Sequence, residues 1–251
     1  METTTKRNIR IEQGPKRVRT YLGGHVVADT TNPVLVWEIP YYPAYYIPKQ
    51  DVHAEMLTPT GETTHSTSRG DGTLYTIKAG EAEAPNSAWQ YENSPIDELR
   101  DLIRFDWNAM DAWFEEDEQV YTHPRDPYKR VDILASSRTV RIELDGVTLA
   151  ESTQPRILFE TGLPPRYYLP KTDVRMDLLV PTDKETHCPY KGKSGYYSAP
   201  HSADMGKDVA WWYPTPLPES QKIAGLVAFY DEHVDVFIDG DKQERPKTPF
   251  S

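Results

Sequence analysis

Residues 17–52, RVRTYLGGHVVADTTNPVLVWEIPYYPAYYIPKQDV, return 122 positions later as residues 139–174, TVRIELDGVTLAESTQPRILFETGLPPRYYLPKTDV. The same offset runs without a gap from Arg17 to Tyr75, where 22 of 59 positions are identical to the residue 122 places later. Average composition alone would produce about three or four matches over this length. The sequence therefore contains an internal repeat, which predicts two homologous domains.

The two copies also set the expected domain bounds. The offset still holds beyond a variable loop, where Trp89 falls on Trp211. We therefore predict an N-terminal tail, a first domain, a connector, a second domain and a C-terminal tail at residues 1–14, 15–117, 118–135, 136–240 and 241–251.

Short strands joined by turns dominate the pattern within each copy. Gly23-Gly24 and Asp145-Gly146 interrupt runs of β-branched residues, which is a strong hairpin signal. The 22 prolines leave little room for long helices. The expected fold class is mainly β with short helices, a β-rich α+β class, arranged as two homologous compact antiparallel β-domains in tandem.

One helix and one closing hairpin are expected in each copy. In residues 94–104, SPIDELRDLIR, Ser94 stands at the N-cap position and Pro95 at the first helical position. Pro218 gives residues 217–226, LPESQKIAGL, the same but shorter signal. The stretches after these helices, FDWNAMDAWFE at 105–115 and VAFYDEHVDVFID at 227–239, are typical of hairpins.

Composition excludes several classes of function. A formal net charge of −11 argues against a nucleic-acid partner, because nucleic-acid recognition begins from a basic face. The chain shows no apolar run that predicts a membrane span, and its first ten residues lack the apolar segment of a signal peptide. A single cysteine forms no internal disulfide, so we expect a cytoplasmic protein. The pattern predicts neither a metal site nor another cofactor, because Cys-x-x-Cys and His-x-x-x-His are absent from the sequence.

The copies differ most in the stretch THCPYKGKSGYY at residues 186–197, which holds the only cysteine. The second copy reads HCPYKG where the first reads HSTSRG. Cys188 therefore aligns with a serine, whereas both copies keep the basic residue and the glycine. A loop needed only for folding would tolerate such loss in either copy. The asymmetry predicts an intact site in the second domain and a degenerate site in the first.

The chain resembles a tandem member of the DUF427 family, a family without an established activity. The second copy carries the resemblance in ETGLPPRYYLPKTDVRMDLL, THCPYKGKSGYYS and AWWYPTPLPESQKIAGLVAFYDEHVD, and the first copy matches more weakly through PYYPAYYIPKQDV and AWQYENSPIDEL. Together with the linker phrase HPRDPYKRVD, the likeness covers nearly all of residues 15–240. It implies a compact β-sheet domain and does not name a substrate.

Two residues of the loop are candidate catalytic groups. Cys188 is either a buried small hydrophobe or a nucleophile, and a nearby cation such as Lys191 would increase its thiolate fraction. Arg69 of the first copy aligns with Lys191, so both copies keep a positive charge at this position. We predict that Lys191 forms an ion pair with Glu160 or Asp173, which are also kept in both copies.

Aromatic side chains from three segments are candidate binding groups. The structural interpretation assigns these side chains to alternating core and surface positions. The functional interpretation is that they form a cage for a planar, apolar or cationic molecule. The predicted binding set consists of Tyr168, Tyr190, Tyr196, Trp211, Tyr213, Glu160 and Asp173. We expect a pocket beside Cys188 and a filled or flattened place in the first domain.

Two functions follow as alternatives. The first is a small-molecule enzyme, a cysteine-dependent hydrolase or transferase in which Lys191 stabilises developing negative charge. The second is a non-catalytic module that binds a small ligand or a peptide in the aromatic cage. The expected partner is a small molecule, with no nucleic acid and no membrane; the sequence leaves the oligomeric state open.

Overall fold

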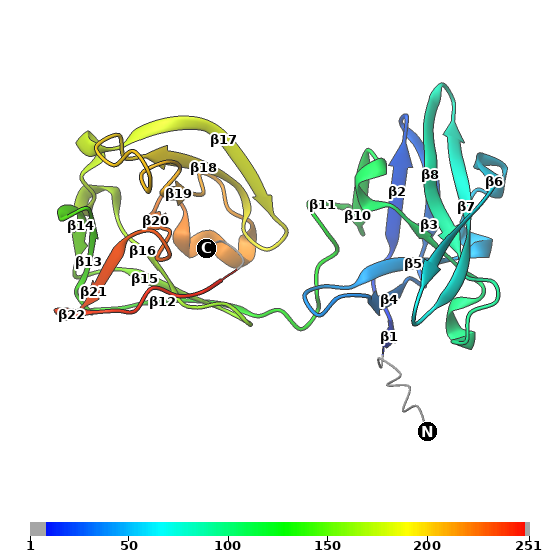
Figure 1. Ribbon diagram of the computed structural model, residues 1–251, viewed down its shortest axis with the longest axis horizontal. Helices are drawn as coiled ribbons and strands as arrows, with labels where there is room; N and C mark the ends of the chain where they lie inside the picture. Colours follow the sequence, from blue (N-terminus) through cyan, green and yellow to red (C-terminus); the bar gives the residue numbers. More distant parts are fainter. Residues whose placement is uncertain (1–8, 249–251) are drawn as a thin grey trace. The chain divides into compact units, whose positions relative to one another are not determined.

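The computed structural model describes residues 9–248, which form two compact units that divide between Asp126 and Pro127. Each unit consists mostly of short strands, and the strands of every sheet pair in the antiparallel sense (Figure 1). The predicted fold class is therefore confirmed. In the described residues, no helix is both long and apolar enough to cross a membrane.

Unit 1 contains a seven-stranded sheet in the order β1-β4-β5-β9-β8-β7-β6 and a four-stranded sheet in the order β11-β10-β2-β3. The strands are β1 (Arg10–Gln13), β2 (Val18–Leu22), β3 (His25–Thr30), β4 (Val34–Trp37), β5 (Ala44–Pro48), β6 (Leu57–Ser66), β7 (Gly70–Ala79), β8 (Ala82–Gln90), β9 (Leu102–Phe105), β10 (Ala112–Glu115) and β11 (Glu118–Val120). Short 3-10 helices lie between them: η1 (Lys49–Asp51), η2 (Ala54–Met56), η3 (Asp97–Leu99) and η4 (Trp107–Ala109).

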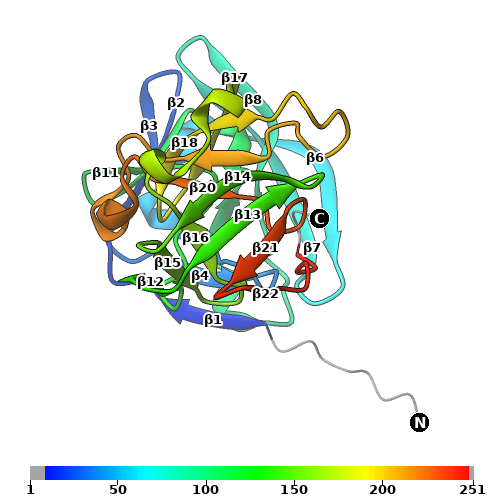
Figure 2. The ribbon, with the colours of Figure 1, turned by 90° about the vertical axis from the view of Figure 1, so that its left-hand side faces the viewer.

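Unit 2 contains sheets in the orders β12-β15-β16, β14-β13-β21-β22 and β17-β18-β19-β20. Figure 2 shows β14, β13, β21 and β22 side by side. The strands are β12 (Val131–Ala135), β13 (Val140–Leu144), β14 (Val147–Ser152), β15 (Arg156–Glu160), β16 (Arg166–Tyr168), β17 (Val180–Cys188), β18 (Gly192–Ser198), β19 (Ala210–Trp212), β20 (Val227–Phe229), β21 (Asp235–Ile238) and β22 (Asp241–Lys242). The 3-10 helices are η5 (Lys171–Asp173), η6 (Met176–Leu178) and η7 (Pro218–Ile223).

Strand register confirms the repeat at the level of backbone pairing. Ser66 pairs with Gly70 across β6 and β7, and Cys188 pairs with Gly192 across β17 and β18. The pairing of β7 with β8 is likewise reproduced by β18 with β19, 122 residues later in both strands. The two units are thus the same fold with different side chains.

The predicted helix at residues 94–104 is wrong. Only Asp97–Leu99 forms a single 3-10 turn, and the chain then enters β9. Strand β9 lies between β5 and β8, where Leu102, Ile103 and Phe105 are buried. Tertiary pairing of these apolar residues outweighs a weak local helix preference. The second predicted helix is present as the 3-10 helix η7, with Pro218 at its start.

The predicted closing hairpins are also wrong, because their two strands belong to different sheets. Strand β9 pairs with β5 and β8, whereas β10 pairs with β2 and β11. In unit 2, β20 pairs with β19 and β21 pairs with β13. The apolar alternation in each stretch correctly predicted two strands. The residues between those strands, however, connect one sheet to another.

The structure places the ends of the units differently from the predicted bounds. Strand β1 lies in the predicted N-terminal tail and β22 in the predicted C-terminal tail, and both are paired. Strands β11 and β12 lie in the predicted connector, yet β11 pairs within unit 1 and β12 within unit 2. These strands fall outside the repeated sequence or at its edges, so the repeat alone does not reveal them.

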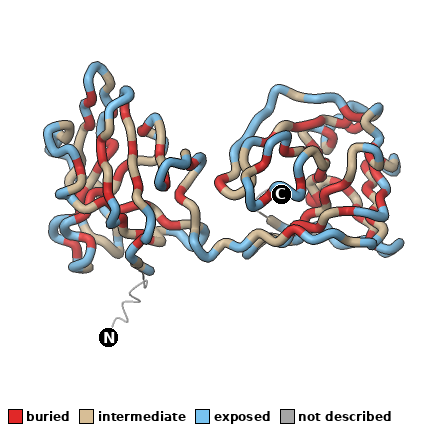
Figure 3. Tube along the Cα trace, turned by 180° about the vertical axis from the view of Figure 1, so that it is seen from behind, coloured by how far each residue is buried: buried red, intermediate tan, exposed pale blue. Residues whose placement is uncertain are grey.

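Within residues 9–248, each unit has two apolar clusters, and strand alternation decides which residue belongs to which cluster. In unit 2, Tyr167 packs against the larger cluster while Tyr168 belongs to the smaller one. Tyr197 and Tyr196 divide in the same way. Figure 3 shows buried positions interleaved with half-buried and exposed ones along the strands of both units. Neighbouring residues thus point to opposite faces of a strand, and the smaller cluster collects the aromatic candidates.

Candidate functional site

A tight turn presents the loop of the second unit. Strands β17 and β18 pair as far as Cys188 and Gly192, which leaves three residues in the turn. The Lys191 N–H donates to the Cys188 carbonyl over 3.3 Å. Gly192 has a φ of +95°, and its counterpart Gly70 has +86°. Because side chains disfavour this backbone region, both copies keep a glycine after the basic residue.

The predicted ion pair between Lys191 and Glu160 is confirmed. The lysine Nζ contacts a Glu160 carboxylate oxygen, and the two side chains are only 12% and 8% exposed. Burial, the largest single effect, lowers the pKa of Lys191, but the charges of Cys188 and Glu160 together outweigh it and raise this pKa above its usual value. The lysine is therefore positively charged at neutral pH and is held by Glu160.

Four predicted aromatic residues lie in one buried cluster around this pair. Tyr168, Tyr196, Trp211 and Tyr213 belong to it. The Trp211 indole N–H donates to the Tyr168 hydroxyl over 3.1 Å. Burial raises the pKa of Tyr168 to about 12 although Lys191 pulls it down, and burial raises the pKa of Tyr213 well above its usual value. Both hydroxyls therefore keep their protons at neutral pH.

Hydroxyl groups continue the cluster toward the strand that carries Cys188. The Thr186 hydroxyl lies 2.8 Å from the Ser194 hydroxyl and 2.8 Å from the Tyr196 hydroxyl. Cys188 itself is half-buried and has a free thiol. Lys191, Tyr168 and Tyr213 each interact electrostatically with Cys188, so a cation and phenol groups lie near the thiol.

Two predicted site residues have other partners. The Asp173 carboxylate accepts a hydrogen bond from the Ser152 hydroxyl over 2.6 Å, and Asp51 accepts from Thr30 at the same distance in unit 1. This bond fixes a turn in both copies, which explains the retention of the aspartate. The Tyr190 carbonyl accepts from the Ser220 hydroxyl over 3.1 Å and so ties the turn to η7.

The corresponding place in unit 1 has the same carboxylate with more cations. Glu38 lies 3.6 Å from the Arg69 guanidinium and 3.3 Å from that of Arg104, and it accepts a hydrogen bond of 2.6 Å from the Tyr46 hydroxyl. The carboxylate, cation and tyrosine are therefore common to the fold. What distinguishes unit 2 is the thiol and the single lysine.

Comparison of the two copies did not identify a buried acidic pair, Asp231 and Glu232, that lies beside Trp211. Arg166 bridges both oxygens of Glu232 at 2.5 and 2.9 Å and lies 3.4 Å from Asp231. Its guanidinium stands 5.8 Å from the Trp211 ring. Ala44 occupies the matching register position in unit 1, so the repeat offered no signal for this group.

Stability should depend on pH through Asp231. Burial raises the pKa of Asp231 to about 7 against the pull of Arg166, whereas the unfolded value is about 3.9. The folded state binds the extra proton, so this contribution is complete below about pH 4 and is lost as the pH rises through 7. Between these limits, the unfolding free energy of the wild type should fall relative to that of Asp231→Asn by about 2–4 kcal/mol. Chemical denaturation of both proteins from pH 4 to 8 measures the difference, and a constant difference would contradict the expectation.

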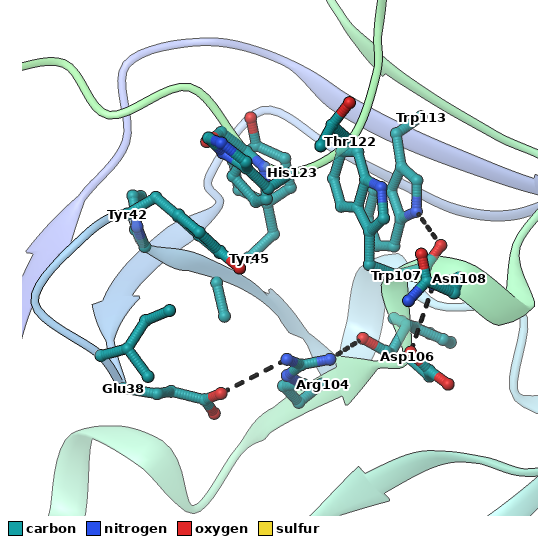
Figure 4. Close-up of a pocket in the computed structure, with 15 residues that line it drawn as sticks. Glu38, Tyr42, Tyr45, Arg104, Asp106, Trp107, Asn108, Trp113, Thr122 and His123 are labelled. Atoms are coloured by element: carbon teal, nitrogen blue, oxygen red, sulfur yellow. Dashed lines mark hydrogen bonds and ion pairs between the residues drawn. The ribbon is translucent and has the colours of Figure 1, made fainter. Parts of the chain in front are cut away.

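A cavity of about 300 Å³ lies in unit 1, in the domain predicted to be degenerate. Figure 4 shows it bordered by Tyr42 and His123 on one side and by Trp107 on another, with Glu38 and Arg104 at its base. A smaller pocket of about 170 Å³ in unit 2 is lined by residues that include Tyr167 and Asp231 and does not include Cys188. The expected pocket beside Cys188 is not among these cavities.

The two units differ at one strand position that lines the cavity of unit 1. Ala44 lines the cavity of unit 1, and Arg166 stands in its register position in unit 2. A long guanidinium side chain occupies space that a methyl group leaves open. The residues described here include no group of three or more His, Cys, Asp or Glu arranged to hold a metal ion.

Comparison with known proteins agrees with the repeat. No curated protein matches the chain. The model of one family, described as a domain of unknown function (DUF427), matches twice, over residues 10–116 and 132–240. These two matches correspond to the two structural units and cover most of the chain. The protein belongs to the DUF427 family and carries two copies of its domain.

Proposed function

We propose that the second domain carries a small-molecule site in which Cys188 is the nucleophile of a thiol-dependent hydrolase or transferase. The observation that supports this best is a half-buried free thiol that interacts electrostatically with Lys191, a cation fixed by Glu160. A fixed cation favours the thiolate form, which is the reactive one. A reducing compartment such as the cytoplasm would keep this single thiol available.

The proposed chemistry is nucleophilic displacement in two steps. The Cys188 thiolate attacks an electrophilic carbon of the substrate, a carbon–sulfur bond forms, and the leaving group departs with the bonding electron pair. Water in a hydrolase, or an acceptor molecule in a transferase, then breaks the carbon–sulfur bond and restores the thiolate. Lys191 would stabilise negative charge that develops on the substrate, and the protonated Tyr168 and Tyr213 hydroxyls are candidate hydrogen-bond donors.

The first domain supports the same proposal by contrast. Ser66 replaces the cysteine there, and its hydroxyl lies 3.3 Å from the Ser68 hydroxyl and 3.4 Å from the Arg69 N–H. A serine hydroxyl needs an adjacent base to become a nucleophile. Only the second copy therefore combines the shared carboxylate and cation with a group that is reactive by itself.

Alkylation of the native protein tests the proposal. At pH 7.5, iodoacetamide should modify Cys188 in the folded wild type, and mass spectrometry reads the reaction without ambiguity because the chain has one cysteine. Lys191→Met should slow alkylation of the folded protein because it removes the fixed cation near the thiol, whereas Lys191→Arg should retain most of the rate. Lys171→Met is the matched control, since that lysine stacks on Trp212 at 3.5 Å. Modification only after denaturation would refute the nucleophile.

The aromatic cluster favours a second candidate, a non-catalytic module that binds a small ligand or a peptide. Tyr168, Tyr196, Trp211 and Tyr213 are gathered in one cluster next to the turn. The two candidates differ in their dependence on sulfur. Cys188→Ser should abolish catalysis by a thiol enzyme and leave the affinity of a binding module nearly unchanged.

A further inference from the structure

The cavity of unit 1 has walls that hold flat rings. The Tyr42 and His123 rings are stacked, with centroids 3.8 Å apart and planes 8° from parallel. The Trp107 and Trp113 rings are stacked as well, at 4.9 Å and 4°. Figure 4 places these two pairs on different sides of the same space. Aromatic faces at the border of a small cavity favour a planar occupant that stacks on them.

Hydrogen bonds fix these walls before anything binds. The Trp113 indole N–H donates to the Trp107 carbonyl over 3.2 Å, and His123 Nδ1 lies 2.7 Å from the Pro124 carbonyl. Trp113 and Tyr45 are buried in the main core of the unit. The walls are therefore preorganised, which reduces the entropy lost when a ligand binds.

The Glu38 carboxylate at the base of the cavity is paired with arginines. Arg69 and Arg104 contact the Glu38 carboxylate, and Asp106 lies on the cavity wall beside Arg104. The Glu38 carboxylate is thus already paired within the protein, and Arg104, one of its partners, lines the cavity. A charge that is already paired favours a neutral ligand over a cation or an anion.

Arg104 and Asp106 still have hydrogen-bonding capacity in the described structure. Arg104 donates to the Phe105 carbonyl and to Glu38, whereas a guanidinium has five N–H donors. Asp106 accepts from the Asn108 N–H through one oxygen, Oδ1. Both residues line the cavity, and a donor and an acceptor on its lining complement an edge that carries a carbonyl oxygen and an N–H.

We propose that this cavity binds a small, neutral, planar heteroaromatic molecule with a lactam edge. The ring stacks between the aromatic walls, its carbonyl oxygen accepts from Arg104, and its N–H donates to Asp106. A volume of about 300 Å³ lies at the small end of ligand pockets, which suits a molecule of one or two fused rings. This site uses none of the residues around Cys188.

Calorimetric titration of the full chain with 4-quinazolinone tests the proposal. Saturable binding is expected, with a dissociation constant of about 1 mM or below. Arg104→Met should weaken it by about tenfold, and Tyr42→Ala at the rim should weaken it severalfold. Arg100→Met is the matched control, because that arginine pairs with Asp97. The affinities of Arg100→Met and of Cys188→Ser for 4-quinazolinone should equal that of the wild type.

Comparison probes separate this ligand class from its alternatives. 3-Methyl-4-quinazolinone lacks the N–H and should bind more weakly than 4-quinazolinone, as should benzoate and benzyltrimethylammonium. Thermal melting of each variant establishes that it is folded, and Tyr42→Ala keeps the test decisive if Arg104→Met unfolds the unit. Absence of saturable binding, tighter binding of either charged probe, or equal loss in Arg100→Met would overturn the proposal.

Discussion

Replacing Lys191 by methionine is expected to lower the unfolding free energy of the second unit by about 3–5 kcal/mol, because it leaves the Glu160 carboxylate buried without its counter-ion. Both side chains are nearly sealed from water, so solvent screens the loss only weakly. Chemical denaturation of the wild type and of Lys191→Met at pH 7 measures the difference. Equal unfolding free energies would show that the charge serves a ligand alone.

Two further variants define the cause. Lys191→Arg keeps the cation that the first unit has as Arg69, and it should recover most of the stability. The double variant Lys191→Met with Glu160→Gln should be more stable than the single Lys191→Met, since no buried charge is left unpaired.

Lys191 itself stays charged over the ordinary pH range. The folded pKa of Lys191 is raised, so its contribution is complete below the unfolded value of about 10.4 and is lost only as the pH rises above it. Between pH 6 and 9 the lysine therefore stays charged, and its own titration does not weaken the ion pair with Glu160.

Replacing Arg166 by methionine should produce a loss of at least similar size. Asp231 and Glu232 would then remain buried side by side with their shared cation removed. We expect a decrease in unfolding free energy of about 3–5 kcal/mol at pH 7.5, measured by denaturant titration. At pH 5 the loss should be smaller, because protonation of the two carboxyl groups relieves their repulsion.

An exposed arginine provides the control for Arg166. Arg175 pairs with Asp177 on the surface, where both side chains are more than half exposed. Arg175→Met should change the unfolding free energy by less than about 1 kcal/mol. If the two variants lose the same amount, burial of the Arg166 group is not the source of its contribution.

Sequence comparison within the chain predicted the features that both copies need. The Lys191–Glu160 pair followed from the joint retention of a carboxylate and a cation, and the strand registers followed the constant offset. The same logic included Asp173, whose retention instead reflects its bond to Ser152. A residue kept twice reports a shared contact without showing which contact it is.

Features specific to one unit were beyond this logic. Arg166 and the acidic pair have no counterpart to mark them, and the cavity of unit 1 depends on a small residue, Ala44, in a place where the other copy has a large one. The helix predicted at residues 94–104 failed for a related reason. Its second half is a buried strand whose partners, β5 and β8, are separated from one another by more than 30 residues of sequence.

The equal registers of the two units have a consequence for how the chain finds its structure. The hairpin β6–β7 and the hairpin β17–β18 present the same spacing of backbone donors and acceptors, so each strand has two geometrically equivalent partners on one chain. Correct assembly must then be decided by side chains, for example Tyr196 in place of Leu74 opposite the shared tryptophan. The sequence differences between the copies thus favour pairing of each strand within its own unit. They limit exchange of strands between the two units or between molecules.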